Sequence, residues 1–134
     1  MPETRAPYAI KRTLDLDVDE AERRIREELA EEGFGILTEI DVRQTLKKKL
    51  DEEFRPYRIL GACNPPFAHQ ALEAETDIGL LLPCNVIVYE GDEEGTAVVA
   101  VIDPVTQLGV AERDDLAPLA EQVRDRMVRA LERV

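Results

Sequence analysis

The chain has two cysteines and one histidine, and all three lie within 22 residues, at Cys63, His69 and Cys84. Sulfur and imidazole nitrogen are the ligands that zinc prefers, and Glu73, one helical turn beyond His69, could supply a fourth. The spacing matches none of the short CxxC or HxxxH pairs that define zinc motifs. A metal site formed by Cys63, His69 and Cys84 is thus one hypothesis, which the residue types support and the spacing does not.

A catalytic thiol is a second hypothesis for the same segment. Cys63 precedes a predicted helix, and the partial positive charge at a helix N-terminus favours a thiolate. A reactive cysteine also needs a base within hydrogen-bond distance, and His69 lies about a turn and a half along that helix. Two simpler alternatives remain open: a Cys63–Cys84 disulfide, or two buried thiols that act as small hydrophobic side chains beside an exposed histidine.

Binding of a small anion is the third hypothesis, and the one we favour among the functional alternatives. Asn64 is predicted to cap the helix that begins at Pro65, and the backbone amides of a helix N-terminus bind anions. Arg55 and Arg58, on the preceding strand, could complete a pocket for a phosphate or carboxylate beside Cys63 and Asn64. The two prolines at the start of this helix remove two of the amide donors, which weakens the hypothesis.

Common catalytic motifs are absent from the sequence. It contains no GxGxxG, GxxxxGK, HExxH or GxSxG pattern, and a single histidine excludes chemistry that needs two. Catalytic residues and cofactors therefore stay unknown, and we expect a binding protein without chemistry of its own rather than an enzyme. A thiol- or metal-dependent enzyme centred on Cys63, His69 and Cys84 is the alternative.

Charge and composition limit the partners. The 134 residues include 17 basic and 29 acidic side chains, a net charge of −12, which disfavours nucleic acid. Six of the basic residues fall between Arg43 and Arg58 with only three acidic ones, so that segment is +3 and the remainder −15. The longest apolar run, 78–88, is interrupted and too short to span a membrane. We expect no secretory signal in residues 1–12 and reduced thiols in the cytoplasm.

The residue pattern predicts a single α+β domain over residues 1–134, with a mainly antiparallel sheet of about five strands and helices on one face. Strands are predicted at 8–14, 35–42, 55–63, 85–90 and 96–102, the last two as a hairpin. Helices are predicted from Asp17 to Gly33, at 42–50, at 64–74 and from about 116 to 134, where Asp114 or Asp115 is the expected N-cap. The resulting order is β-α-β-(short α)-β-α-β-β-α, with 104–110 as a connector.

The segment from Tyr57 to Glu90, with GACNP before a helix and LLPC after it, resembles the central signature of the domain of unknown function 302 family. The similarity in pattern extends over nearly the whole chain. It implies a fold similar to one repeat of the TATA-binding protein and a homodimer, but no DNA binding and no established activity. The apolar strands of the predicted hairpin could also bury a dimer surface.

Overall fold

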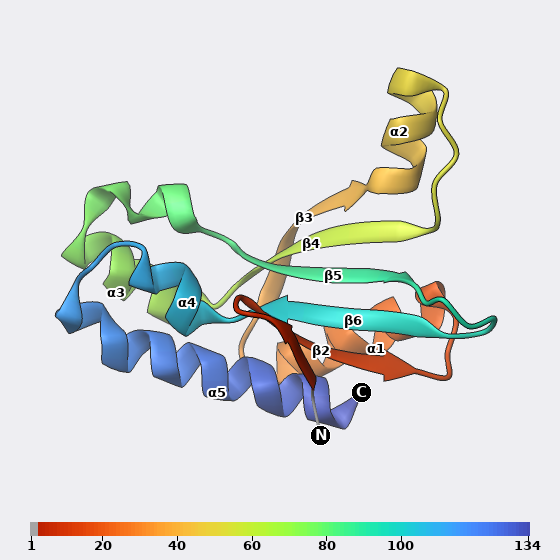
Figure 1. Ribbon diagram of the computed structural model, residues 1–134. Helices are drawn as coiled ribbons and strands as arrows, with labels where there is room; N and C mark the ends of the chain where they lie inside the picture. Colours follow the sequence, from red (N-terminus) through yellow and green to blue (C-terminus); the bar gives the residue numbers. More distant parts are fainter. Residues whose placement is uncertain (1–2) are drawn as a thin grey trace.

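The computed structural model describes residues 3–134, with side chains from residue 7 onward. Residues 1 and 2, part of the stretch considered for a secretory signal, lie outside the described residues. One antiparallel sheet in the strand order β1-β2-β6-β5-β4-β3 organises the molecule (Figure 1). Its strands are β1 (Glu3–Ala6), β2 (Ala9–Leu14), β3 (Gly35–Asp41), β4 (Tyr57–Cys63), β5 (Cys84–Glu90) and β6 (Ala97–Ile102).

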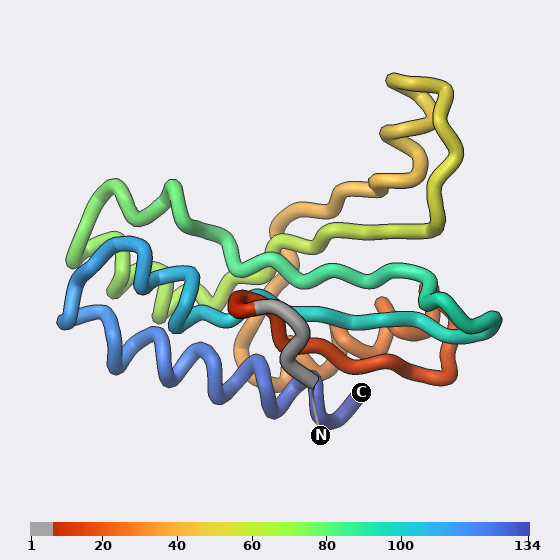
Figure 2. The backbone as a smooth tube through the Cα atoms, in the orientation of Figure 1, coloured from red at the N-terminus to blue at the C-terminus, as the bar shows by residue number. Residues whose placement is uncertain are grey.

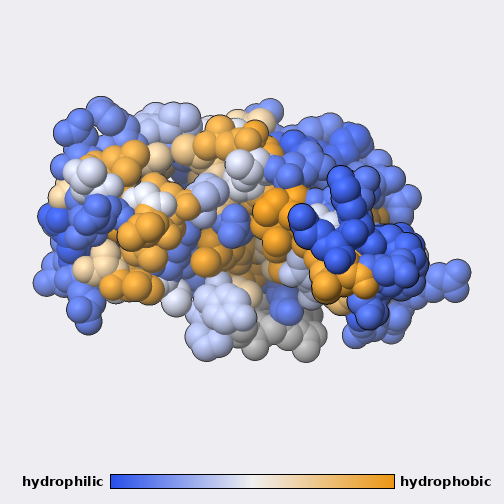
Figure 3. All heavy atoms as spheres, turned by 90° about the horizontal axis from the view of Figure 1, so that it is seen from above, coloured by the Kyte–Doolittle hydropathy of each residue, from blue (hydrophilic) through white to orange (hydrophobic). Residues whose placement is uncertain are grey.

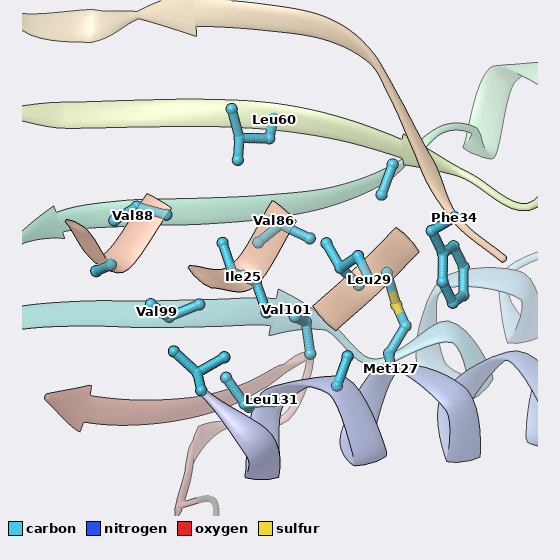
Figure 4. Packing of buried hydrophobic residues seen from close by; sticks show 14 of the residues in the cluster. Ile25, Leu29, Phe34, Leu60, Val86, Val88, Val99, Val101, Met127 and Leu131 are labelled. Atoms are coloured by element: carbon cyan, nitrogen blue, oxygen red, sulfur yellow. The ribbon is translucent and has the colours of Figure 1, made fainter. Parts of the chain in front are cut away.

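Strand alternation decides which side chains enter the core. In β5, Cys84, Val86 and Val88 are buried, whereas Asn85 between them is exposed. Successive side chains of a strand point to opposite faces, so one face of the sheet carries the core. In Figure 4 this face meets Ile25 and Leu29 from one helix and Met127 and Leu131 from another, and all four are fully buried.

Two long helices cover that face. The first, α1 (Val18–Glu31), begins where the carboxylate of Asp17 accepts from the backbone N–H of Glu20 at 2.8 Å, and buries Val18, Ala21, Ile25 and Leu29. The second, α5 (Ala117–Arg133), contacts α1, β2 and β6. Burying a side chain such as Leu29 contributes roughly 1.5–3 kcal/mol, and these two stripes supply most of the helical contribution to the core.

Short helices build a second hydrophobic cluster beyond one end of the sheet. They are α3 (Pro65–Ala74), the 3₁₀ helix η1 (Thr76–Leu81), α4 (Pro104–Gly109) and the 3₁₀ helix η2 (Asp114–Leu116). Their buried side chains pack against the first half of α5; the cluster consists of Ala71, Ile78, Leu108, Leu116, Leu119 and Ala120. The larger cluster lies between the sheet, α1 and the rest of α5.

One helix stands apart from both clusters. The α2 helix (Val42–Leu50) connects β3 to β4, and none of its residues is buried. Figure 2 shows α2 and the segment that returns from it projecting away from the body of the molecule. The repeat of Val42, Leu46 and Leu50 predicted this helix correctly, but the apolar side that it creates is not covered by the described residues.

The predicted α+β fold with helices on one face is confirmed, with three corrections. A sixth strand, β1, lies at the sheet edge, and the connector at 104–110 contains α4. Neither Asp114 nor Asp115 caps α5, because both lie in η2, and Asp115 pairs with Arg113 at 2.7 Å instead. Among the residues that the structure describes, no helix combines the length and apolarity needed to cross a bilayer.

Candidate functional site

Cys63 ends β4 and Asn64 follows at the N-cap position of α3, as the sequence predicted. Asn64 is only 8% exposed, and its side chain does not cap the helix. Its Nδ2 instead donates to the carbonyl oxygen of Glu32 at 3.2 Å, which ties the start of α3 to the end of α1. The missing side chain at Gly33 (φ +88°) makes this approach possible, since a Cβ there would lie 3.1 Å from Asn64 Nδ2.

A cavity of about 340 Å³ opens beside Cys63, at the boundary between the two hydrophobic clusters. Its walls come from β3, β4, β5, α3, η1, α4 and α5. No charged or histidine side chain is among the described residues that line it: Phe34, Leu37, Thr38, Ala62, Cys63, Asn64, Phe67, Ala68, Ala71, Leu72, Gly79, Leu82, Pro83, Cys84, Leu108, Leu119 and Val123. The cavity is therefore apolar, with two thiols, one hydroxyl and one carboxamide as its polar side-chain groups.

Hydrophobic side chains also surround the cavity on the outside. Leu37 is 67% exposed and Leu72 is 41% exposed, although both contribute to its wall, and Leu80 in η1 is 88% exposed. In Figure 3, hydrophobic patches lie over the end of the molecule formed by α3 and η1. An apolar ligand entering here would keep contact with apolar surface at the mouth.

Neither thiol has the electrostatic environment of a nucleophile. Burial raises the pKa of Cys63, and it raises the pKa of Cys84 to about 12 with a smaller contribution from the nearby Cys63. The Cys84 thiol is held as a donor to Oε1 of Gln107 at 3.3 Å. Gln107 in turn donates from Nε2 to the carbonyl oxygens of Leu81 and Pro83, which fixes the segment before β5.

The structure does not bring His69 to the cysteines. His69 is 75% exposed on α3, where its Nε2 lies 3.0 Å from Oε1 of Glu73. It does not line the cavity, whereas Cys63 and Cys84 both do. Within residues 3–134, no group of three histidine, cysteine, aspartate or glutamate side chains could hold a metal ion.

The arginines of the proposed anion pocket also lie elsewhere. Arg58 forms ion pairs from Nη1 with Asp19 at 2.7 Å and Glu22 at 3.0 Å on α1. Arg55 donates to the carbonyl oxygen of Glu90 and to Asp92 near the β5–β6 turn. Arg58 lies five positions before Cys63 on an extended strand, about 16 Å along β4. Of the four residues suggested for anion binding, only Cys63 and Asn64 share a site.

Sequence reasoning missed most of the cavity wall. Phe67 and Ala71, four residues apart on α3, form the apolar side of a helix that was considered only for its cap and its histidine. Phe34, Leu108 and Val123 come from three other elements, and only the tertiary structure brings them together. The available sequence signal was the four-residue spacing of Phe67 and Ala71, which is typical of an apolar face of a helix.

The fold and this cavity define a small α+β protein with one helix-covered antiparallel sheet and an apolar pocket at its end. Residues 10–134 match the family described as "Domain of unknown function DUF302", so the chain belongs to the DUF302 family. A crystal structure of an uncharacterized conserved DUF302 protein from Bacillus stearothermophilus is similar, with 29% identity and a TM-score of 0.87. The similarity covers 96% of this chain and 98% of that protein. No curated protein matches the chain significantly.

Proposed function

We propose that this protein binds a small, mainly apolar molecule in the cavity beside Cys63, does no chemistry on it, and acts as a homodimer. The observation that supports the ligand is the cavity itself: about 340 Å³, at the lower end of the range for small-molecule sites, with apolar walls. Its few polar groups lie around Cys63 and Asn64, where they would orient a ligand carrying one hydrogen-bonding group.

The wall composition favours an uncharged ligand over an anion. Burying a charge without an opposite charge costs several kcal/mol, and no cationic side chain is among the described residues that line the cavity. Arg55 and Arg58 would have to leave their carboxylate partners and move along the sheet to reach it. Anion binding at Cys63 and Asn64 stays a prediction, and the experiment below includes it.

A binding role agrees better with the thiols than a catalytic one does. Burial raises the pKa of Cys63, so its thiol stays protonated at neutral pH. Among the described residues that line the cavity, no basic side chain could accept its proton. Cytoplasmic location and the absence of nucleic-acid partners also stay predictions. The proposed dimer is based on the uncovered edge of the sheet at β3 and on α2, where apolar side chains remain exposed.

A ligand panel tests the proposal. Indole, benzyl alcohol and hexanol are compared with phosphate, sulfate and succinate by melting temperature and calorimetry, since a ligand that binds only the folded state raises the melting temperature. We expect an increase with the apolar compounds alone. Ala68→Phe, which fills the cavity from α3, should remove the increase, whereas Gln70→Phe on the exposed side of the same helix should keep it.

Each other outcome is decisive. An increase with the anions but not with the apolar compounds would replace the proposed ligand by the anion of the sequence-based hypothesis. An unchanged melting temperature across the whole panel, or an increase that survives in Ala68→Phe, would reject the cavity as the binding site.

A further inference from the structure

One hydrogen-bonding atom of the cavity wall has no partner among the described residues. It is Oδ1 of Asn64, a residue that is 8% exposed. Nδ2 of the same carboxamide donates to the carbonyl oxygen of Glu32 at 3.2 Å. Because a carbonyl oxygen only accepts, this contact fixes which end of the carboxamide points to Glu32, and Oδ1 is the other end. The side chain makes no cap contact with α3 that would satisfy Oδ1.

The end of α1 holds the carboxamide in this orientation. The carbonyl oxygen of Glu32 also accepts from Nη1 of Arg126 at 3.2 Å, which ties it to α5. Rotating the carboxamide of Asn64 by half a turn would place Oδ1 against this carbonyl oxygen, and two acceptors repel each other. Oδ1 therefore points away from the end of α1.

Oδ1 of Asn64 is also not sealed inside the protein. Where side chains are described, every buried side-chain nitrogen or oxygen that is shielded from solvent has a hydrogen-bond partner. Because Oδ1 has no such partner, it keeps some accessible surface. The opening that Asn64 borders is the cavity beside Cys63, so a molecule in that cavity is the available partner for Oδ1.

The chemistry of this oxygen indicates what a ligand must carry. A carboxamide oxygen only accepts, so its partner has to be an N–H or O–H group. An apolar ligand without such a group would separate Oδ1 from water and leave its hydrogen bond unmade, which is unfavourable. An anion would meet the lone pairs of Oδ1, and a cation would find no carboxylate among the described residues that line the cavity. A neutral donor is therefore the group that fits.

We propose that Oδ1 of Asn64 selects neutral apolar molecules that carry an N–H or O–H group, such as indoles and phenols, for the cavity beside Cys63. The inference rests on the proposed binding function and names the class of ligand. Phe34 and Phe67 also form part of the wall, and Cζ of Arg126 lies 5.4 Å from the centroid of the Phe67 ring. Aromatic rings pack favourably against one another, so an aromatic ligand with a donor at its edge suits this wall.

Three ligands of the same shape test the selection. Indole, indene and benzofuran differ at one ring position, which is N–H, CH₂ and oxygen respectively, and only indole has a donor. Calorimetry should show that indole binds the wild-type protein about 10-fold more tightly than either analogue, as expected for one hydrogen bond to a buried acceptor. Indene is less polar than indole, so a wall without an accessible acceptor would prefer indene.

Substitutions in the wall identify the atom responsible. Asn64→Leu keeps a side chain of similar size without the carboxamide, so the preference for indole should be lost while indene binds at least as well. Loss of the Glu32 contact affects all three ligands, whereas the ratio of their affinities reports on Oδ1. Thr38→Val and Cys63→Ala remove other polar groups of the wall and should keep the preference. These two variants decide by elimination if Asn64→Leu does not fold.

The contrary results separate this inference from the proposed function. It is overturned if the wild type binds indole no more tightly than its analogues, if the preference survives in Asn64→Leu, or if Thr38→Val or Cys63→Ala abolishes it. Equal binding of all three ligands that is lost in Ala68→Phe would leave the proposed function standing. Absence of binding by all three would reject both.

Discussion

Nη1 of Arg12 lies 2.8 Å from the carbonyl oxygen of Val134, so a side chain from β2 caps the helix that ends the chain. The same nitrogen donates to the carbonyl oxygens of Leu131 and Glu132 at 3.3 and 2.9 Å. The last carbonyls of a helix lack intrahelical partners and carry partial negative charge, which a guanidinium satisfies. This explains why a charged residue occupies a core-facing position between Ile10 and Leu14.

Replacing Arg12 with Met should therefore destabilise the protein. Methionine keeps most of the apolar stem but leaves three carbonyl groups without their charged donor, a loss of about 1–3 kcal/mol in the free energy of unfolding. Urea denaturation measures it. Lys11→Met, next to Arg12 but on the other face of β2, is the control and should change stability by less than about 0.5 kcal/mol. Equal effects of the two substitutions would show that Arg12 does not hold α5.

Gly61 is required where β3, β4 and the segment before β5 converge. A Cβ at this position would lie 2.9 Å from Cγ of Pro83 and closer still to Oγ1 of Thr38. We expect Gly61→Ala to cost about 1–3 kcal/mol through overpacking, as measured by thermal denaturation. Adding Thr38→Ala should recover part of the loss. Gly35→Ala, where a new Cβ meets nothing within 4 Å, should be nearly neutral. A stable Gly61→Ala variant would contradict this account.

Local patterns in the sequence predicted the elements better than the site. Asp17 caps α1 and the stripe from Val18 to Leu29 lies within it, so capping and periodicity, which are both local, were sufficient to locate this helix. The same rules placed Asn64 at the N-cap of α3, but its side chain donates to the backbone carbonyl oxygen of Glu32 instead of capping the helix. Long-range competition of this kind cannot be read from neighbouring residues.

Long-range contacts also explain why Arg55 and Arg58 do not lie beside Cys63. Arg58 was assigned to an anion site because it is close to Cys63 in the sequence. In the structure α1 packs beside its strand, and the carboxylates of Asp19 and Glu22 on α1 pair with it. An acidic chain offers every arginine several carboxylate partners. Proximity in sequence therefore said little about which charges remain free to bind a ligand.

The two thiols should react slowly and in a fixed order. Because burial raises both pKa values, Cys84 to about 12, little thiolate exists at pH 8. With a chromogenic disulfide reagent, we expect half-buried Cys63 to react before buried Cys84, and both more slowly than free cysteine. Cys63→Ser should remove the faster phase alone. Fast modification of Cys63 at pH 6 would instead indicate an activated thiolate.

A ligand in the cavity should also protect Cys63. Saturating indole should slow the faster phase in the wild type, because Cys63 forms part of the wall. The Ala68→Phe variant should show slow modification with or without indole, since phenylalanine occupies the same space. Unchanged kinetics in the wild type at a concentration that raises its melting temperature would place the ligand elsewhere.

Glu32 should make stability depend on pH in the acid range. Its carboxylate accepts from Arg129 at 3.1 Å and pairs with Arg133 at 2.9 Å, and these contacts, the Arg129 hydrogen bond above all, lower its pKa below the ordinary 4.5 despite burial. At a pH between the folded-state and unfolded-state pKa values of Glu32, this carboxylate is more often protonated in the unfolded protein than in the folded one. The stabilisation from Glu32 is therefore complete above about pH 4.5 and is lost as pH falls through the lower, folded-state value.

Glu32→Gln isolates this contribution. The variant should be less stable than the wild type at pH 7, because two arginines lose their charged partner. The difference should shrink as pH falls below 4.5, since the wild-type carboxylate is then protonated as well. Glu121→Gln, on the exposed side of α5, is the matched control and should follow the wild type at every pH. A Glu32→Gln curve parallel to that of the wild type from pH 7 to 3 would mean that the arginines stabilise this region without the charge of Glu32.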